Sequence, residues 1–329
     1  MKVIDIHTHG IGGSDTKSAS VGAVLGIAEM QGAAGVSEIV LSIYSGPIPT
    51  MRQQMELTRQ AMEHQRSANS GQRSVTARKP ATRNPERATR NRQRSSIPMT
   101  LDSGASWKDP CPSLGAARIL GVHLEGPFLN PARCGALDAA SFVEPRERAL
   151  RTLIDGFEDV VKVIAIAPEL DGAPALIRRM ADRGITVSMG HSDATYSEAE
   201  KGWHAGARGV THLFNAMRSV HHREPGIAGF GLLNQEMYVE VIADPFHLHP
   251  ATLQMIFTMK KPERILIVSD SVRETRVNGK GRAEADAHGT LLGGSMAVTA
   301  AVRRLIKLGF DERTIWKTVT TNPARYLRP

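Results

Sequence analysis

The stretch Val3-Ile4-Asp5-Ile6-His7-Thr8-His9 joins a short β-branched run to a pair of histidines. A run of this length that ends in polar residues is typical of a buried strand. Side chains alternate along a strand, so His7 and His9 point the same way from its C-terminal end, whereas Thr8 points away. The stretch therefore predicts a first strand that delivers two imidazoles to one place.

Similar β-branched runs recur along the chain, and helical patterns lie between them. The further strand-like runs are 38–43, 119–124, 160–166, 185–189, 209–213, 238–243 and 264–268. The clearest helical stretches are 173–183, 197–205, 250–259 and 295–308. Strand–helix alternation implies parallel βαβ units, and eight such units favour an α/β fold of the (β/α)8 TIM-barrel type over an open doubly wound sheet. The glycine-rich stretch 10–15 has Asp15 where a dinucleotide fingerprint needs its third glycine, so that site is excluded.

Length and composition indicate a globular protein that works inside the cell. The chain has 329 residues, of which 41% are hydrophobic and 22% charged. No run reaches the roughly 18 apolar residues of a membrane span, and Asp5 interrupts the first apolar run too early for a signal peptide. With only Cys111 and Cys134, neither a disulfide framework nor a thiolate zinc site can form. We expect a cytoplasmic protein without a membrane partner.

The net charge of +8 is concentrated in one segment, residues 66–94, which holds nine Lys or Arg and a single acidic residue, Glu86. The rest of the chain carries 32 basic and 32 acidic residues, so a nucleic-acid-binding face on the folded body is not supported. The segment lacks apolar periodicity, and the sequence predicts one barrel domain over 1–329 with a disordered basic insertion, 66–115, between the second and third strands. Two alternatives could explain this segment: it is a functional basic arm, or a corrupted stretch of the gene has replaced an ordinary helix.

Polar side chains capable of binding a metal end several of the predicted strands, where the catalytic residues of such barrels lie. They are His7 and His9, then His123 and Glu125, His191, His212 and Asp270. A single histidine at a strand end is more often structural than functional. A purely structural role does not explain so many histidines and carboxylates at several strand ends. Imidazole nitrogen with carboxylate oxygen suits zinc, with iron or another divalent transition metal as the alternative.

These strand ends lie within longer sequence motifs, and the motifs resemble those of the N-acetylglucosamine-6-phosphate deacetylases of the amidohydrolase superfamily. The matching phrases are Val122-His123-Leu124-Glu125-Gly126-Pro127-Phe128-Leu129, Gly190-His191-Ser192-Asp193-Ala194, Thr211-His212-Leu213-Phe214-Asn215-Ala216-Met217 and Arg223-Glu224-Pro225-Gly226. Shorter matches lie at 242–247, 268–270, 289–295 and 321–325. The resemblance covers 1–60 and 118–329, which is nearly everything outside the basic segment.

The resemblance implies a role for each site residue. It makes Glu125, His191 and His212 the ligands of a tightly held divalent metal, and His7 and His9 those of a second ion, so that one or two ions are expected. It makes Asp270 the general acid and base of catalysis. The residues implied to bind the substrate are Asn215, Ala216, Arg223 for a phosphate, and His247. The resemblance also implies a homodimer.

Three features depart from the family pattern. Leu137 stands where the family usually has a substrate-contacting histidine, and Pro245 stands where a glycine is usual. The small β-sandwich that most relatives build from their two termini is expected to be absent.

The chemistry also follows from the residues themselves. An amide is a poor electrophile and water a weak nucleophile, and a metal can polarise the carbonyl and lower the pKa of water. Asp270 could accept a proton from the water and return it to the departing amine. The sequence therefore predicts hydrolysis of the acetamide of N-acetylglucosamine 6-phosphate, or a related amino-sugar phosphate, to the amine and acetate. The alternatives are another metal-dependent amidase or cyclic-amide hydrolase, or an inactive relative that binds a partner.

Overall fold

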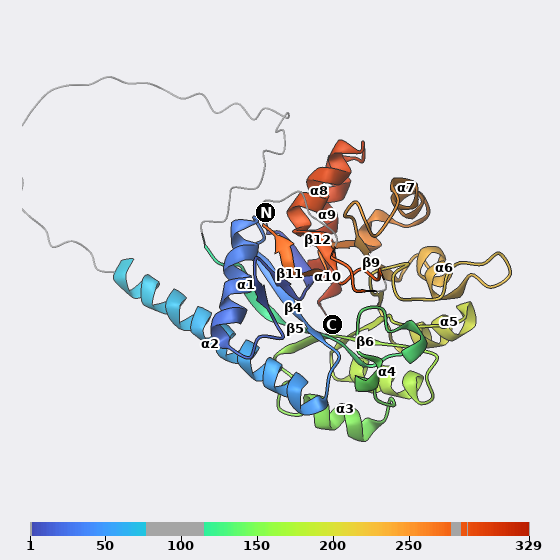
Figure 1. The fold of residues 1–329 in the computed structure, drawn as a ribbon, viewed down its shortest axis with the longest axis horizontal. Helices are drawn as coiled ribbons and strands as arrows, with labels where there is room; N and C mark the ends of the chain where they lie inside the picture. The colour runs from blue at the N-terminus through green and yellow to red at the C-terminus, as the bar shows by residue number, and fades with distance from the viewer. Residues whose placement is uncertain (1, 77–114, 278–283, 288, 329) are drawn as a thin grey trace, which may run out of the picture.

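A ten-stranded parallel sheet forms the centre of the protein, and helices surround it (Figure 1). The computed structural model describes residues 2–76, 115–277, 284–287 and 289–328. The strands of the sheet are β1 (Ile4–Thr8), β4 (Glu38–Tyr44), β5 (Arg118–Phe128), β6 (Val161–Ile166), β7 (Thr186–Met189), β8 (Gly209–Val210), β9 (Tyr238–Ile242), β10 (Ile265–Val268), β11 (Ser271–Arg276) and β12 (Gly294–Met296). A separate antiparallel pair, β2 (Gly10–Ile11) and β3 (Ser14–Asp15), follows β1.

The sheet curves so that β10, at one end of the sheet order, comes close to β1. Its order is β10-β9-β8-β7-β6-β5-β4-β1-β11-β12, in which every neighbouring pair is parallel. Only two residues separate β10 from β11, and β11 pairs with β1 through Thr8 and Ser271. Backbone bonds from Asp270 to His7 (2.8 Å) and from His9 to Ser271 (2.8 Å) extend that contact. The fold is therefore TIM-like, and the C-terminal ends of its strands converge.

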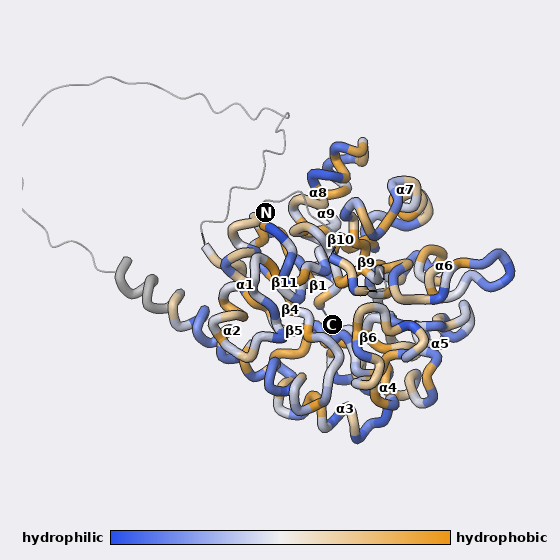
Figure 2. Tube along the Cα trace, in the orientation of Figure 1, coloured by the Kyte–Doolittle hydropathy of each residue, from blue (hydrophilic) through white to orange (hydrophobic). Residues whose placement is uncertain are grey.

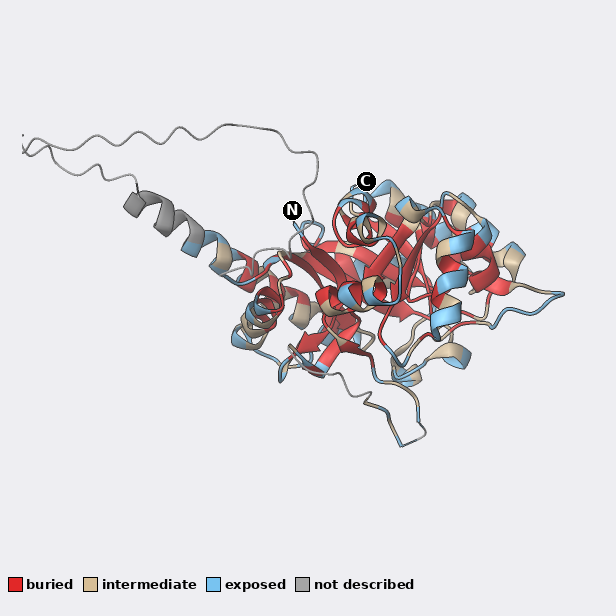
Figure 3. Ribbon diagram, turned by 90° about the horizontal axis from the view of Figure 1, so that it is seen from above, coloured by how far each residue is buried: buried red, intermediate tan, exposed pale blue. Residues whose placement is uncertain are grey.

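The helices lie outside the sheet with their apolar faces toward it, as the red centre and pale-blue periphery of Figure 3 show. Their bounds are α1 (Val21–Ala33), α2 (Ile48–Thr76), α3 (Glu147–Ile154), α4 (Ala173–Asp182), α5 (Tyr196–Ala205), α6 (Gly226–Leu233), α7 (Pro250–Met259), α8 (Val298–Lys307), α9 (Glu312–Thr318) and α10 (Thr321–Tyr326). Helix α5 begins at a capping box between Thr195 and Glu198 and ends at Gly206, whose φ of 119° suits a residue without a Cβ. These local signals start a helix directly after the strand end that carries His191.

Two apolar cores hold the layers together, and hydrophobic residues concentrate accordingly at the sheet (Figure 2). The larger core lies between the strands and the helices and includes Val239 and Val241 of β9. The smaller core is built from residues of β1, β4, β6, β9, β10 and α10, so it fills the space that the strands enclose. Tyr326 of α10 is fully buried in this inner core, and Tyr238 packs against it with ring centroids 5.0 Å apart. The inner core leaves the C-terminal ends of the strands for polar residues.

The structure confirms the eight predicted strands and the four predicted helices, with small shifts of their ends. The largest differences concern β5, which continues to Phe128, and β8, which is only two residues long. β8 ends early because His212, Phe214 and Ala216 have positive φ angles (31°, 76° and 47°) and turn the chain. The motif around His212 is therefore a turn that follows a strand rather than part of one.

The first part of the predicted insertion is helical rather than irregular. Residues 66–76 form the last turns of α2, whose first half packs through Met51, Met55 and Met62 against the sheet. Extending an already packed helix costs little per residue, so a polar sequence can continue it without its own apolar face. The rest of the predicted insertion, residues 77–114, lies outside the described residues. Within the described ranges, the pair β2–β3 is the only sheet besides the central one.

Candidate metal centre

The strand ends bring the predicted histidines and carboxylates into one buried cluster. His7 lies in β1 and His9 directly after it, and Glu125 lies in β5. His191, His212 and Asp270 closely follow the ends of β7, β8 and β10, respectively. All six side chains are buried, with at most 9% of any residue exposed. Thr8 points away as predicted, since Gln31 of α1 donates to its hydroxyl at 2.9 Å.

Glu125, His191 and His212 form a tight triangle of potential ligand atoms. Oε1 of Glu125 lies 3.0 Å from Nε2 of His191 and 3.1 Å from Nε2 of His212, and the two Nε2 atoms lie 3.1 Å apart. The other ring nitrogen of His191 contacts the carbonyl oxygen of Arg133 at 3.0 Å. A backbone carbonyl can only accept, so His191 has its proton on Nδ1 and its Nε2 lone pair faces the triangle.

A second group, His7, His9 and Asp270, lies directly beside the first. Nε2 of His9 is 3.2 Å from Oε2 of Glu125, so Glu125 borders both groups. Oδ1 of Asp270 lies 3.3 Å from Nε2 of His7 and 3.5 Å from Nε2 of His9. Tyr44, at the end of β4, stacks on the His9 ring with centroids 3.7 Å apart and an interplanar angle of 20°.

Three of these residues have left-handed backbone conformations. His191, His212 and Asp270 have φ angles of 46°, 31° and 47°. Such angles are costly for residues other than glycine and gather at functional sites, where the surrounding structure enforces them. Here they turn three side chains from strand ends toward one point.

Burial and crowding shift the pKa values in this cluster. Burial raises the pKa of the Asp270 carboxyl well above its usual range, and the nearby Glu125 carboxylate adds to this. Burial alone would also raise the pKa of Glu125, but its close contacts with His191, His212 and His9 hold it well below its usual range. Burial keeps the pKa of His7 well below its ordinary value, so its imidazole is neutral.

The residues fit a divalent metal. Ligands at the usual 2.0–2.2 Å from zinc lie about 3.3–3.6 Å from one another in a tetrahedron, slightly more than the edges of the Glu125 triangle. Nε2 of His7, which faces Asp270, is buried without a hydrogen-bond partner among the described residues. Crowded imidazole nitrogens around shared carboxylate oxygens are the donor set of a transition-metal site. The groups Glu125–His191–His212 and His7–His9–Asp270 each offer three ligand atoms within 4.8 Å of one another.

A cavity of about 530 Å³ opens from this cluster. Asn215, Ala216 and His247, which the sequence predicts to bind the substrate, all line it, and so does Leu137. His247 is fixed by Asp244, which accepts from its Nδ1 at 3.0 Å and from its backbone N–H at 2.9 Å. This leaves Nε2 of His247 for a ligand.

Of the four residues predicted to bind the substrate, Arg223 is the one that the structure does not bring to the cavity. It is exposed in the loop before α6 and is not part of the cavity lining. Two other cations, Lys17 and Arg273, do line the cavity. Lys17 closely follows the end of β3, which is a signal that could have identified it, whereas Arg273 lies within β11.

Sequence reasoning missed three further residues near the site, Tyr44, Asp244 and Glu240, and it included a fourth, His123, only among the possible metal ligands. Tyr44 ends a predicted strand, and Asp244 closely follows another, so strand-end position could have identified both. His123 and Glu240 lie inside strands and are fully buried. A charged residue within an apolar run, as in Tyr238-Val239-Glu240-Val241, was the available signal for Glu240.

A TIM-like sheet with buried histidines and carboxylates at its strand ends defines the class of the protein as an amidohydrolase. No protein-family model matches the chain. The chain is 34% identical over 224 residues to the N-acetylgalactosamine-6-phosphate deacetylase of Escherichia coli O157:H7, which covers 64% of this chain and 59% of the relative. It is 34% identical over 212 residues to the N-acetylglucosamine-6-phosphate deacetylase of Bacillus subtilis, over 59% of this chain and 52% of the relative.

Among solved structures, a mutant of the N-acetyl-D-glucosamine-6-phosphate deacetylase of Mycobacterium smegmatis in complex with N-acetyl-D-glucosamine-6-phosphate matches with a TM-score of 0.77 and 25% identity. That match covers 99% of this chain and 77% of the solved chain. In sequence over about 60% of its length and in fold over nearly all of it, the chain is similar to the N-acetylglucosamine-6-phosphate deacetylases. It spans between half and two thirds of the length of the two curated relatives named above.

Proposed function

We propose that the protein removes the acetyl group from an N-acetylated amino-sugar 6-phosphate, giving acetate and the free amine. The observation that carries this proposal is the triangle of Glu125, His191 and His212 next to Asp270 at the floor of the cavity. Relatives that act on N-acetylglucosamine 6-phosphate and on N-acetylgalactosamine 6-phosphate both match the chain, so both sugars are candidate substrates.

Glu125, His191 and His212 would hold the first divalent ion, and His7 and His9 would hold a second. When bound, a divalent ion polarises the amide carbonyl and lowers the pKa of water. Asp270 accepts the proton of the attacking water and returns it to the departing amine, and its buried position beside the histidines allows both transfers. Nε2 of His247 contacts the carbonyl or a sugar hydroxyl, and Asn215 and Ala216 border the sugar.

The proposal also includes zinc as the ion, a homodimer as the assembly, a cytoplasmic location and Arg223 as the phosphate contact, all carried over from the sequence analysis. No helix within the described ranges is long and apolar enough to cross a membrane. Elemental analysis of purified protein tests the metal, and light scattering tests the dimer.

The deciding experiment measures acetate release by the metal-loaded protein from four compounds: both acetylated sugar phosphates and both sugars without phosphate. We expect turnover of at least one phosphorylated sugar and at least about 100-fold lower kcat/KM without the phosphate, the effect of losing charge-assisted contacts. No acetate from any phosphorylated sugar would contradict the proposal.

Two observations favour a second candidate function, hydrolysis of an amide that carries no phosphate. Leu137 gives the cavity an apolar wall where the family usually has a histidine, and Arg223 lies away from the cavity. A panel of cyclic amides and acetylated amines without phosphate, assayed with the same preparation, tests this candidate. Metal binding without any hydrolysis would instead support a binding protein.

A further inference from the structure

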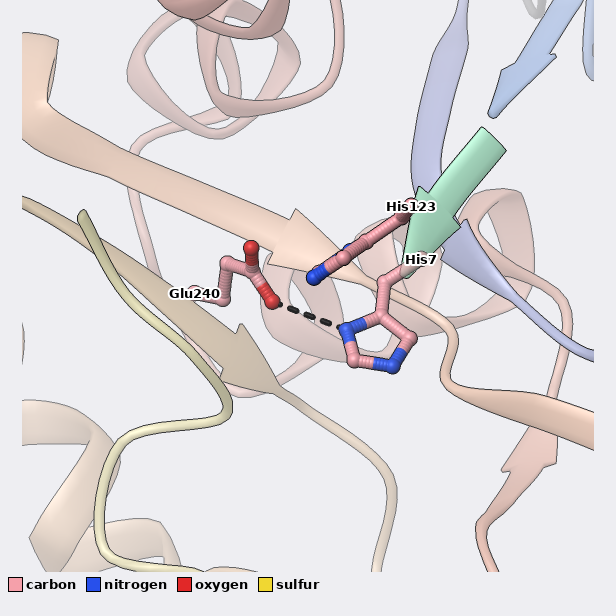
Figure 4. A group of neighbouring side chains, drawn as sticks. All are labelled: His7, His123 and Glu240. Carbon is pink, nitrogen blue, oxygen red and sulfur yellow. Dashed lines mark hydrogen bonds and ion pairs between the residues drawn. The ribbon is translucent and has the colours of Figure 1, made fainter. Parts of the chain in front are cut away.

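Next to the metal centre, the inside of the barrel contains a carboxylate that the proposed chemistry does not use. Glu240 lies in the middle of β9 and is fully buried. The flanking Val239 and Val241 pack in the outer core, so Glu240 faces the inside of the barrel. Figure 4 shows its carboxylate pointing toward His7 of β1 and His123 of β5.

Among the described residues, the carboxylate of Glu240 has one hydrogen-bond partner, the ring of His7. Oε2 of Glu240 lies 2.9 Å from Nδ1 of His7, and both side chains are fully buried. An ionised carboxylate can only accept, so the N–H of His7 is on Nδ1, and a neutral imidazole then has its lone pair on Nε2. That Nε2 atom lies 3.3 Å from Oδ1 of Asp270 and 3.6 Å from Oε1 of Glu125, on the side of the proposed metal centre.

His123 restricts the same ring from another side. The centroids of His123 and His7 lie 4.5 Å apart with the rings edge to face at 61°. A flip of the His7 ring would place a C–H group against the Glu240 carboxylate and remove the buried hydrogen bond. The geometry therefore favours one orientation and one tautomer of His7.

We propose that Glu240 is a positioning residue that holds the proton of His7 on Nδ1 and thereby presents Nε2 to a divalent ion bound with His9. It acts through His7 and touches neither the substrate nor the ion. The inference rests on the proposed second ion of the metal centre but not on the identity of the sugar.

One alternative makes the opposite forecast about the same proton. His7, His123 and Glu240 offer three ligand atoms within 4.8 Å of one another and could hold an ion themselves. Nδ1 of His7 would then be a ligand and could not carry a proton. The position of the His7 proton therefore separates the two arrangements.

The first test reads that proton in the unaltered protein. Long-range ¹H–¹⁵N correlation spectra of protein labelled with ¹⁵N-histidine distinguish the two tautomers, and the His7→Asn variant assigns the His7 signals. We expect the Nδ1–H tautomer in the metal-free and the zinc-loaded protein. An Nε2–H tautomer, or an Nδ1 that loses its proton when zinc is added, would overturn the proposal. This test does not require a Glu240 variant to fold.

The second test measures zinc affinity and stoichiometry by chelator competition for Glu240→Gln. We expect the second ion to bind about 10–100-fold more weakly, as for other losses of a histidine's hydrogen-bond partner, and the first ion to bind unchanged. In a His7→Asn background the same change should have no further effect on zinc binding. The matched control is Asp5→Asn, because Asp5 is equally buried but contacts the backbone N–H groups of His7 and Ser269, not an imidazole.

Several outcomes would contradict the proposal: one ion only in the unaltered protein, unchanged binding in Glu240→Gln, or an equal loss in the Asp5 control. None of these measurements uses the sugar. A protein that binds two ions as expected but releases no acetate would reject the proposed function and leave the role of Glu240 supported.

Discussion

Oδ1 of Asp270 lies within 3.3 Å of Nε2 of His7 and 3.5 Å of Nε2 of His9. The same residue has a left-handed backbone, and its N–H donates to the carbonyl oxygen of His7 at 2.8 Å. The barrel closure between β10–β11 and β1 therefore sets the position of this carboxylate. A shift of one residue in that pairing would turn its side chain to the other face of the sheet.

The first prediction separates a proton-transfer role of Asp270 from a ligand role. Asp270→Asn keeps the shape of the side chain but removes its basicity, so we expect turnover to fall by at least about 100-fold. Metal content and melting temperature should stay close to those of the unaltered protein. All three quantities are measured on one preparation. Turnover within a few-fold of the unaltered protein would exclude the role, and release of metal in step with activity would make Asp270 a ligand.

The second prediction concerns Glu125, whose carboxylate borders both groups of ligand atoms. Glu125→Gln replaces it by a neutral amide, which is a far weaker ligand, so most bound metal should be lost after dialysis. Glu38→Gln is the control, since Glu38 lies at the start of β4, at the opposite end of the strands, and pairs with Lys2 and Arg118. Full metal occupancy in Glu125→Gln would refute the assignment.

The third prediction tests the stacking of Tyr44 on His9. Tyr44→Leu removes the ring contact, and we expect the second ion to bind about 2–10-fold more weakly, the range of one aromatic pair. Tyr44→Phe keeps the stacked ring and loses only the hydroxyl bond to Asp15, so it should bind zinc like the unaltered protein. Equal zinc affinities of the Leu and Phe variants would show that stacking does not position His9.

The fourth prediction identifies the phosphate contact. Loss of a charge-assisted contact costs about 1.5–3 kcal/mol, so Arg223→Ala should raise KM for the phosphorylated sugar about 10–100-fold and leave KM for the unphosphorylated sugar unchanged. Arg273→Ala is the comparison, because Arg273 lines the cavity and Arg223 does not. A selective effect of the Arg273 change alone would transfer the role to Arg273.

The fifth prediction concerns stability rather than activity. Lys260 at the end of α7 is buried, and its ammonium donates to the carbonyl oxygens of Gly231 and Asn234. Burial lowers its pKa to about 7 from the usual 10.5, so between these values the unfolded chain binds more protons than the folded one. The free energy of unfolding of the unaltered protein, minus that of Lys260→Met, should therefore increase between pH 7 and pH 10 by on the order of 1–3 kcal/mol.

Chemical denaturation at pH 7 and pH 10 measures this difference. Lys261→Met is the control, because Lys261 is exposed and pairs with Glu236. A difference between the unaltered protein and Lys260→Met that does not change with pH would refute the prediction.

The sequence by itself determined the strand order along the chain and the residues that end the strands. Short β-branched runs and helix periodicity are local signals, and His7, Glu125, His191, His212 and Asp270 each follow directly from such a run. The parallel fold then requires that these ends meet, whatever the details of packing. That is why the members of the candidate metal centre could be predicted without a structure.

The tertiary structure alone decided which buried side chains from distant strands touch. Glu240 and His7 are 233 positions apart in the sequence but touch inside the barrel, and no local pattern specifies such a pair. Arg223 matches its motif but is exposed in the loop before α6 and lies outside the cavity. Strand ends are set by local propensity, whereas pairing and cavity walls depend on how the sheet closes on itself.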